Sequence, residues 1–257
     1  VWDAWWPTIE NDPGLRPQTI AQYKHHAHRI RHDLADLEIR HATAGRLNAY
    51  VADAARDPGT GTIRRSVAKS LKIQLVSMCG WAVRRDLLPH NPARDIDIPA
   101  AKKAPVTALT AQQVSDFRAH VTAWAADHPR SDTPLADIVD VMLGTGTRIS
   151  EVLALRWSDI DLAATPATAT ISGTLVMVDG QLRRQEVPKS DAGYRVVSLP
   201  PFATATLMEL RMNARRDDIV FPSGAGTWRH PHNVRRTLRE CRGETWKWVT
   251  PHILRKT

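Results

Sequence analysis

A proline-dense stretch ahead of residue 106 limits how this 257-residue chain can fold. Proline fixes φ, lacks a backbone donor and disfavours a helical conformation in the residue before it, so closely spaced prolines end helices and favour extended chain. We therefore expect a linker over 99–106, a helical domain over 1–98 and a larger domain over 107–257. The prolines concerned are Pro89, Pro92, Pro99 and Pro105.

The first of these domains has two segments with helical period. Over 19–40, apolar residues recur at spacings of three and four, and 63–85 carries a second apolar stripe of the same kind. In the second segment three cations share another face, which can follow a phosphate backbone or can simply be a solvated face. On charge and position we expect phosphate contacts from Lys24, Arg31, Arg65, Lys69 and Lys72.

The second domain mixes helical and extended patterns. Helical period covers 110–126, 135–143, 201–212 and 233–241, whereas 168–178, 182–187 and 194–199 have strand-like patterns. Asp179-Gly180, between the first two of these strands, is a strong hairpin signal. We expect a mainly α fold with a small antiparallel β-sheet inside the second domain.

The composition favours a nucleic-acid partner. Against 27 Asp and Glu the chain has 35 Lys and Arg, a formal net charge of +8, and a basic surface attracts a polyanion. In the second domain we expect phosphate contacts from Arg229, Arg235 and Arg236. No window approaches the roughly 18 consecutive apolar residues of a membrane span. The two cysteines, Cys79 and Cys241, lie too far apart for a disulfide framework, which favours a reducing, cytoplasmic compartment.

The segment G-T-G-T-R-I-S-E over 144–151 is the first candidate site. Its glycines permit a tight backbone before a helix, so Arg148 falls in the first turn near free N–H groups, where a phosphate can bind. Glu151, three residues later, can orient Arg148 through a charge-assisted hydrogen bond. The alternative is a surface pair at the start of a helix, and the spacing alone does not decide between them.

Two further segments carry groups suited to phosphate chemistry. Thr250 is a plausible N-cap with a proline after it, which places His252 and Arg255 on one face of a short helix. A histidine exchanges protons near neutral pH, and an arginine can hold two phosphate oxygens. Lys189 falls at the turn between the last two expected strands. Each pattern alone is common: the helix start can be structural, and the lysine can be merely solvated.

Taken in order, these segments resemble the tyrosine recombinase family, of the phage integrase type. The family's first arginine segment, T-G-x-R-x-x-E followed by L-x-W-x-D-I, is matched by T-G-T-R-I-S-E over 145–151 and L-R-W-S-D-I over 155–160. The family's strand-turn lysine corresponds to Lys189, and its P-H-x-L-R box to P-H-I-L-R over 251–255. The helical segment over 19–40 and W-A-V-R-R-D-L-L-P-H-N-P-A over 81–93 resemble more loosely the family's core-binding domain.

The resemblance implies a helical, SAM-like core-DNA-binding domain followed by an α+β catalytic domain that exchanges DNA strands without a cofactor. Arg148 and Arg255 would stabilise the charge that develops on the phosphate, and Glu151 would support them. Lys189 would protonate the departing 5′ oxygen, and His252 would accept the nucleophile's proton or hold the phosphate. The expected partners are double-stranded attachment-site DNA, three further copies in a homotetramer, and accessory proteins that bend DNA or set direction, in a bacterial host cell at the nucleoid.

The sequence departs from the family pattern after the last box. The family's second His or Trp and its nucleophilic tyrosine follow H-x-x-R, whereas this sequence ends two residues after Arg255. Its three tyrosines are Tyr23, Tyr50 and Tyr194, and none is in the corresponding place. We therefore expect a catalytic domain that is incomplete at its C-terminus and a polypeptide that binds core-site DNA without cleaving it.

Two other classes of protein fit part of the pattern. A sequence-specific DNA-binding protein without catalysis would allow the missing tyrosine, but it has no need for two arginines, a lysine and a histidine in these motifs. A metalloenzyme is suggested by 11 histidines, several of them in 25–32, but the sequence has no H-E-x-x-H or Cys/His zinc spacing, so we expect no metal.

Overall fold

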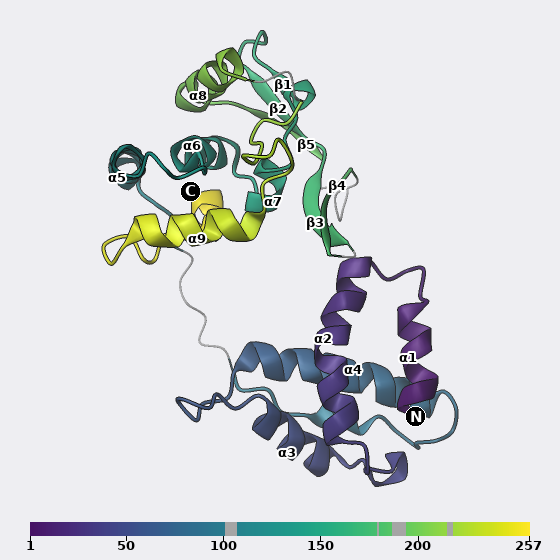
Figure 1. Ribbon diagram of the computed structural model, residues 1–257. Helices are drawn as coiled ribbons and strands as arrows, with labels where there is room; N and C mark the ends of the chain where they lie inside the picture. Colours follow the sequence, from purple (N-terminus) through teal and green to yellow (C-terminus); the bar gives the residue numbers. More distant parts are fainter. Residues whose placement is uncertain (101–106, 179, 187–193, 215–217) are drawn as a thin grey trace. The chain divides into compact units, whose positions relative to one another are not determined.

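The computed structural model describes residues 1–257 except 101–106, 179, 187–193 and 215–217. The chain forms two compact units, Val1–Ala104 and Pro105–Thr257 (Figure 1). Each unit has its own hydrophobic core. Whether the two units have the separate roles expected from the sequence stays a prediction.

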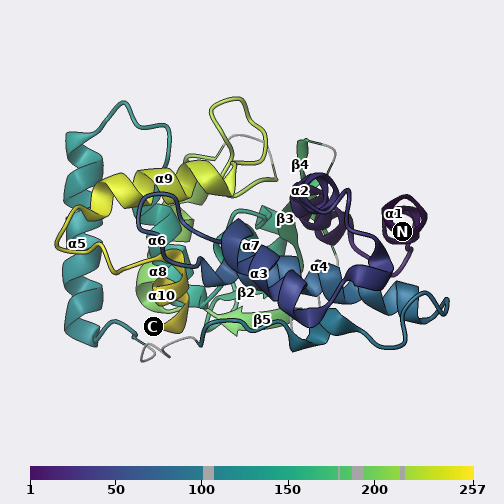
Figure 2. The same ribbon diagram turned by 90° about the horizontal axis from the view of Figure 1, so that it is seen from below.

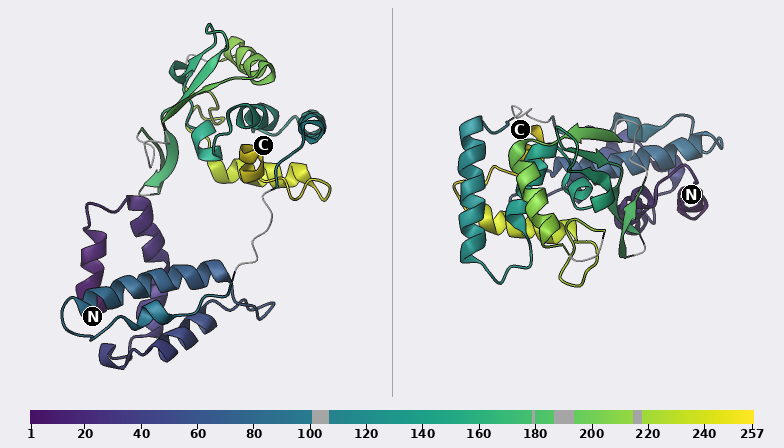
Figure 3. Two further views of the ribbon diagram at one scale, coloured as in Figure 1. Left: turned by 180° about the vertical axis from the view of Figure 1, so that it is seen from behind. Right: turned by 90° about the horizontal axis from the view of Figure 1, so that it is seen from above.

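The first unit is helical. Its longest helix, α4, contacts three others, and the apolar face of α4 is centred on Leu71 and Leu75, which are fully buried (Figures 1 and 3). Trp5 and Leu47 complete this core from neighbouring helices. The elements are α1 (Trp2–Glu10), α2 (Pro17–Asp33), the 3-10 turn η1 (Ile39–His41), α3 (Ala44–Ala54), α4 (Arg65–Val83) and the 3-10 turn η2 (Pro92–Asp95).

The helix expected over 19–40 is wrong at its C-terminal end, because α2 stops at Asp33. Leu34 and Leu37 lie beyond this end, yet both pack on the core from the turn that follows. The apolar spacing therefore continues past the helix that it predicted. The helices α1 and α3 were not expected from the sequence.

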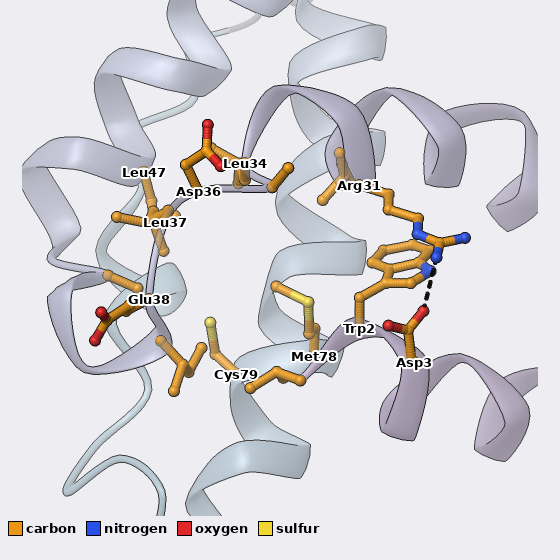
Figure 4. A pocket seen from close by; sticks show the side chains of 15 residues that line it. Trp2, Asp3, Arg31, Leu34, Asp36, Leu37, Glu38, Leu47, Met78 and Cys79 are labelled. Atoms are coloured by element: carbon orange, nitrogen blue, oxygen red, sulfur yellow. Dashed lines mark ion pairs between the residues drawn. The ribbon is translucent and has the colours of Figure 1, made fainter.

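A pocket of about 580 Å³ lies within the first unit, where the end of α2 faces α3 and α4. Figure 4 shows its apolar side chains, which include Leu37, Leu47 and Met78, and an ion pair at its edge between Arg31 and Asp3 at 3.0 Å. The lining is mainly apolar, and the one arginine in it is paired. This pocket is therefore not suited to phosphate chemistry.

In the second unit, helix α6 is central. It packs against α5, α7, α8, α9 and α10, and its residues Ile138, Val141 and Met142 are almost completely buried (Figure 2). Gly144 lets α6 and α8 approach each other closely, because a Cβ at Gly144 would lie 2.5 Å from the Cβ of Ala203 on α8. The helices are α5 (Ala111–Asp127), α6 (Leu135–Thr145), α7 (Ile149–Val152), α8 (Pro201–Met212), α9 (Pro231–Arg242) and α10 (Pro251–Lys256), with the 3-10 turn η3 (Trp157–Asp159).

Two antiparallel sheets stand where one was expected. The three-stranded sheet has the order β1-β2-β5, with Ala169 opposite Val197, and the hairpin β3-β4 forms a separate two-stranded sheet with Val176 opposite Arg183 (Figures 1 and 3). Gly180 has φ +73°, as the expected hairpin turn requires. The strands are β1 (Ile160–Asp161), β2 (Thr168–Ile171), β3 (Thr174–Val178), β4 (Gln181–Gln185) and β5 (Arg195–Ser198).

The strand expected over 168–178 is interrupted because a buried arginine lies against its middle. A Cβ at Gly173 would lie 2.6 Å from Cζ of Arg184, and the neighbouring Ser172 donates through Oγ to Asp159 at 2.7 Å. The Arg184 guanidinium donates to the Ala154 carbonyl at 2.8 Å and to Asp159 at 3.1 Å. These contacts fasten the hairpin to the segment that follows α7.

Candidate functional site

Arg148 lies at the start of α7, where the chain turns sharply out of α6. The turn ends at Gly146, whose φ of +61° is costly for any residue with a Cβ. Arg148 is the N-cap of α7, so the free N–H groups of the first turn lie beside it, as expected. Its side chain is 61% exposed, which leaves the guanidinium accessible to a ligand.

Glu151 holds Arg148 in place. One carboxylate oxygen accepts from Nη1 of Arg148 at 2.6 Å, and the other accepts from the Arg148 backbone N–H at 3.0 Å. Arg195, at the start of β5, donates to the same carboxylate at 3.0 Å. Burial alone would raise the pKa of Glu151, but the hydrogen bonds from Arg148 and Arg195 outweigh it and hold that pKa below its ordinary value. The carboxylate is therefore ionised and orients both arginines.

The last helix carries the second pair of expected residues. Thr250 caps α10 by accepting from the backbone N–H of Ile253, and Pro251 occupies the first helical position, as the sequence predicted. Leu254 is fully buried and fixes the helix on the core. His252 is exposed and Arg255 half-buried, so their polar ends remain accessible.

These two helix starts meet in one pocket of about 290 Å³. Arg148, His252 and Arg255 all line it, although Arg148 lies more than a hundred residues before the others. Arg235, on the long helix α9 that passes α5 and α6 toward α7 in Figure 1, lines the same pocket. The remaining lining residues are Ile149, Ser150, Thr250 and Pro251. The pocket is cationic, and no carboxylate is among the described residues that line it, which suits a phosphate.

Lys189, the remaining expected catalytic residue, lies outside the described residues, so the structure does not place it. Arg195 and Arg184 were not singled out from the sequence, although both shape this region. Arg195 is the second residue of the strand-like segment over 194–199, but nothing in that pattern points to a partner 44 residues earlier.

The three arginines expected to contact phosphate in the second unit have different surroundings. Arg235 lines the pocket, whereas Arg236 lines a separate, open hollow beside Trp124 on α5. The structure argues against the expected role of Arg229, because its side chain is only 6% exposed. Its guanidinium donates to the Pro222 carbonyl at 2.7 Å and pairs with Asp132 at 3.3 Å. Arg229 therefore links two segments of the unit instead of facing a ligand.

Three of the five expected phosphate contacts in the first unit already have protein partners. Arg65 donates through Nε to the Pro99 carbonyl at 2.7 Å, and Lys72 donates to the Ile96 carbonyl at 2.5 Å. Arg31 forms the exposed ion pair with an aspartate on α1. The other two, Lys24 and Lys69, are exposed. The role of all five in DNA binding stays a prediction.

The described residues include neither a metal-binding cluster nor a membrane-spanning helix. No group of three or more His, Cys, Asp or Glu side chains within them could hold a metal ion. None of the helices in this part of the chain is long and apolar enough to cross a membrane. Both cysteines, Cys79 and Cys241, are free and buried, and burial raises the pKa of each thiol to about 11.

Known proteins are similar to this chain in both sequence and fold. Tyrosine recombinase XerC of Xanthomonas axonopodis pv. citri (strain 306) is 32% identical over 73% of this chain and 56% of its own length. The putative prophage phiRv2 integrase of Mycobacterium tuberculosis (strain H37Rv) is 27% identical over 84% of this chain and 54% of its own length. The chain thus spans about half the length of these two relatives.

Solved structures show the same fold at lower sequence identity. Tn1549 transposon integrase in complex with transposon right-end DNA matches all of this chain and 84% of its own with a TM-score of 0.79 and 18% identity. A lambda integrase tetramer bound to a Holliday junction matches 99% of this chain and 70% of its own with a TM-score of 0.66 and 17% identity. The model of the phage integrase family matches residues 108–257, which include the whole pocket. The chain therefore belongs to the phage integrase family of tyrosine recombinases.

Proposed function

We propose that this chain is the DNA-binding and phosphate-activating part of a site-specific recombinase that acts on double-stranded attachment-site DNA. The observation that carries the proposal is the pocket in which Arg148, His252 and Arg255 meet. Charge develops on the non-bridging oxygens when a phosphodiester is attacked, and two fixed guanidiniums supply donors there. Glu151 keeps Arg148 oriented through a hydrogen bond of 2.6 Å.

Proton transfers complete the proposed chemistry. His252, exposed at the edge of the pocket, is suited to accept the proton of an attacking hydroxyl or to donate to the phosphate. Lys189 is the proposed general acid for the departing 5′ oxygen. The guanidiniums carry the stabilising charge, so the proposed step requires neither a metal nor another cofactor.

The proposed nucleophile of the complete reaction is a tyrosine that joins covalently to the 3′ phosphate, which conserves the bond energy for rejoining. Tyr23, Tyr50 and Tyr194 do not line the pocket. Tyr50 is also unsuited to attack, because burial raises the pKa of its hydroxyl far above the ordinary value. We accordingly propose that the 257 residues bind DNA without cleaving it.

The larger assembly is proposed on the family's pattern. Four protomers would meet on two synapsed duplexes in the bacterial cytoplasm at the nucleoid, and accessory proteins would bend the DNA or set the direction. What supports this proposal is that the lambda integrase found as a tetramer on a Holliday junction has the same fold as this chain.

The salt dependence of binding to a duplex tests the phosphate pocket. Arg148→Ala combined with Arg255→Ala should lower the affinity and reduce the slope of log K against log salt by about two, since each lost phosphate contact changes the slope by roughly one. Lys247→Ala is the matched control, because that exposed cation of the same unit already pairs with Glu244 at 3.0 Å. An unchanged slope in the double variant would refute the pocket's role.

A suicide substrate, in which a nick lets the released end diffuse away, tests the absence of cleavage. The 257-residue chain should bind this DNA and form no covalent adduct on a denaturing gel. An adduct would show that one of the three tyrosines, or another nucleophile of the chain, performs the attack. Absence of any DNA affinity would refute the proposed function as a whole.

A further inference from the structure

Arg235 is directed to the pocket by the way in which α9 packs. Val234 and Leu238 on this helix are almost completely buried against the core of the second unit. Arg235 follows Val234 by one residue, so it lies about 100° around the helix from the buried face. Its side chain is exposed and still lines the pocket that holds Arg148 and Arg255.

The pocket has more positive charge than one phosphodiester balances. Among the described residues, no carboxylate lies within ion-pair distance of Arg235 or Arg255, whereas Arg148 is paired with Glu151. Glu151 is itself shared with Arg195, so its single negative charge offsets only one of the two arginines Arg148 and Arg195. A phosphodiester carries a single negative charge, and two guanidiniums without carboxylate partners would still repel each other around it.

Consecutive phosphates of a DNA strand offer the second charge. They follow one another at about 3.4 Å along the helix axis, so an anion beside the reacting phosphate is always present. The volume of about 290 Å³ exceeds what one phosphate group fills. Arg235 also comes from a different helix than Arg148, at the start of α7, and Arg255, in the last turn of α10, so it can reach a neighbouring position.

We propose that Arg235 binds the phosphate next to the reacting one, so that the pocket grips two consecutive phosphates of one strand. This proposal rests on the proposed function and names a role that the motifs around Arg148 and Arg255 do not include. Two contact points fix the orientation in which the strand crosses the pocket, whereas one point leaves the strand free to turn about it. Arg235 thereby positions the reacting phosphate between Arg148 and Arg255.

Two short oligonucleotides isolate the contribution of the second phosphate charge to binding. The first is a thymidine trinucleotide with two charged phosphodiesters, and the second has the same bases with one linkage replaced by a neutral methylphosphonate. Binding to the 257-residue chain is followed at low salt by NMR of the arginine Nε–Hε groups. The variants are Arg235→Ala and, as control, Arg239→Ala, which removes an exposed arginine one turn later on α9 that does not line the pocket.

The unsubstituted chain should bind the doubly charged trinucleotide roughly threefold to tenfold more tightly than the methylphosphonate form. Arg235→Ala should abolish this preference, and Arg239→Ala should retain it. Arg235 is exposed, so its removal should leave the thermal unfolding of the chain unchanged, which a melting curve checks. A preference retained in Arg235→Ala overturns the proposal, as does an unsubstituted chain that binds both forms equally or binds neither.

Binding of a duplex distinguishes this failure from failure of the proposed function. If the chain binds duplex DNA but Arg235→Ala has no effect on the preference, only the two-phosphate grip is wrong. If the preference depends on Arg235 but no duplex binds, the pocket takes two phosphates and the proposed function is wrong.

Discussion

Replacing Glu151 by glutamine tests how the site is held together. The Glu151 side chain is 8% exposed and accepts from the Arg148 backbone, the Arg148 guanidinium and the Arg195 guanidinium. Glutamine keeps the shape and one acceptor oxygen, but it removes the negative charge and points an NH₂ group at one of the donors. Glu151→Gln therefore leaves two arginines close together without the carboxylate between them.

The loss of stability expected for Glu151→Gln depends on how exposed Arg148 and Arg195 are. Breaking a fully buried ion pair costs about 3–5 kcal/mol, whereas an exposed pair contributes about 0–1 kcal/mol. Arg148 is 61% exposed and can be solvated again, but the side chain of Arg195 is only 25% exposed. We expect Glu151→Gln to lower the free energy of unfolding of the second unit by about 2 kcal/mol.

The assay is urea unfolding followed by hydrogen exchange in peptides from Pro105–Thr257, since the chain has two compact units that need not unfold together. The control is Glu244→Gln, which changes an exposed pair and should cost less than about 0.5 kcal/mol. The folded-state pKa of Glu151 is lowered, so its contribution is present above the ordinary value of 4.5 and is lost as the pH falls through the folded pKa. A deficit below about 0.5 kcal/mol, or one that persists unchanged in acid, would refute this reasoning.

Three other predictions address stability and binding. Burial raises the pKa of Asp137 from 3.8 to about 6. At a pH above about 6 the ionised carboxylate therefore destabilises the folded state. Asp137→Asn should stabilise the chain by about 1–2 kcal/mol at about pH 7. Thermal melts should show that this gain shrinks as the pH falls from about 6 towards 3.8, and an equal gain at both ends would contradict it. Gly144→Ala should lower the urea midpoint by the equivalent of about 1–3 kcal/mol, because the new Cβ meets Ala203 at 2.5 Å, whereas Gly45→Ala, with nothing within 4 Å, should cost nothing. Lys69→Ala should lower the affinity for duplexes of any sequence and reduce the salt slope by about one, and an unchanged slope in fluorescence anisotropy would remove Lys69 from the DNA-binding surface.

Local chemistry made much of the pocket around Arg148 and His252 predictable. The helix start at Thr250 follows from a side-chain cap and a proline, both of which act within a few residues. The pairing of Arg148 with Glu151 likewise depends on a spacing of three. That these two helix starts meet was implied only by the family resemblance, since each motif by itself is compatible with an ordinary surface helix. Their meeting depends on the packing of α7 and α10 around α6.

The contrast between Arg235 and Arg229 shows where charge and position cease to be informative. Both are arginines close to α9, and both were expected to contact phosphate. Arg229 is buried by an interaction with Asp132, which is 97 residues earlier, and no periodicity near Arg229 indicates that partner. Arg235 stays exposed because the residue before it, Val234, takes the buried position. The burial of one residue in α9 thus determines what its neighbour can contact.

The cations that share one face of α4, Arg65, Lys69 and Lys72, show the same limit of charge and position in the first unit. Their period correctly places Arg65 and Lys72 on a surface of the helix, but period does not tell what covers that surface. Ile96 is buried, and a buried carbonyl without a donor is costly, whereas Pro99 is exposed. Lys72 and Arg65 supply donors to the carbonyls of these two residues at 2.5 and 2.7 Å. Charge on this face therefore stabilises the segment over 96–99. The Nη groups of Arg65 and two N–H donors of Lys72 remain for a phosphate, so a contact with DNA is compatible with both carbonyl contacts.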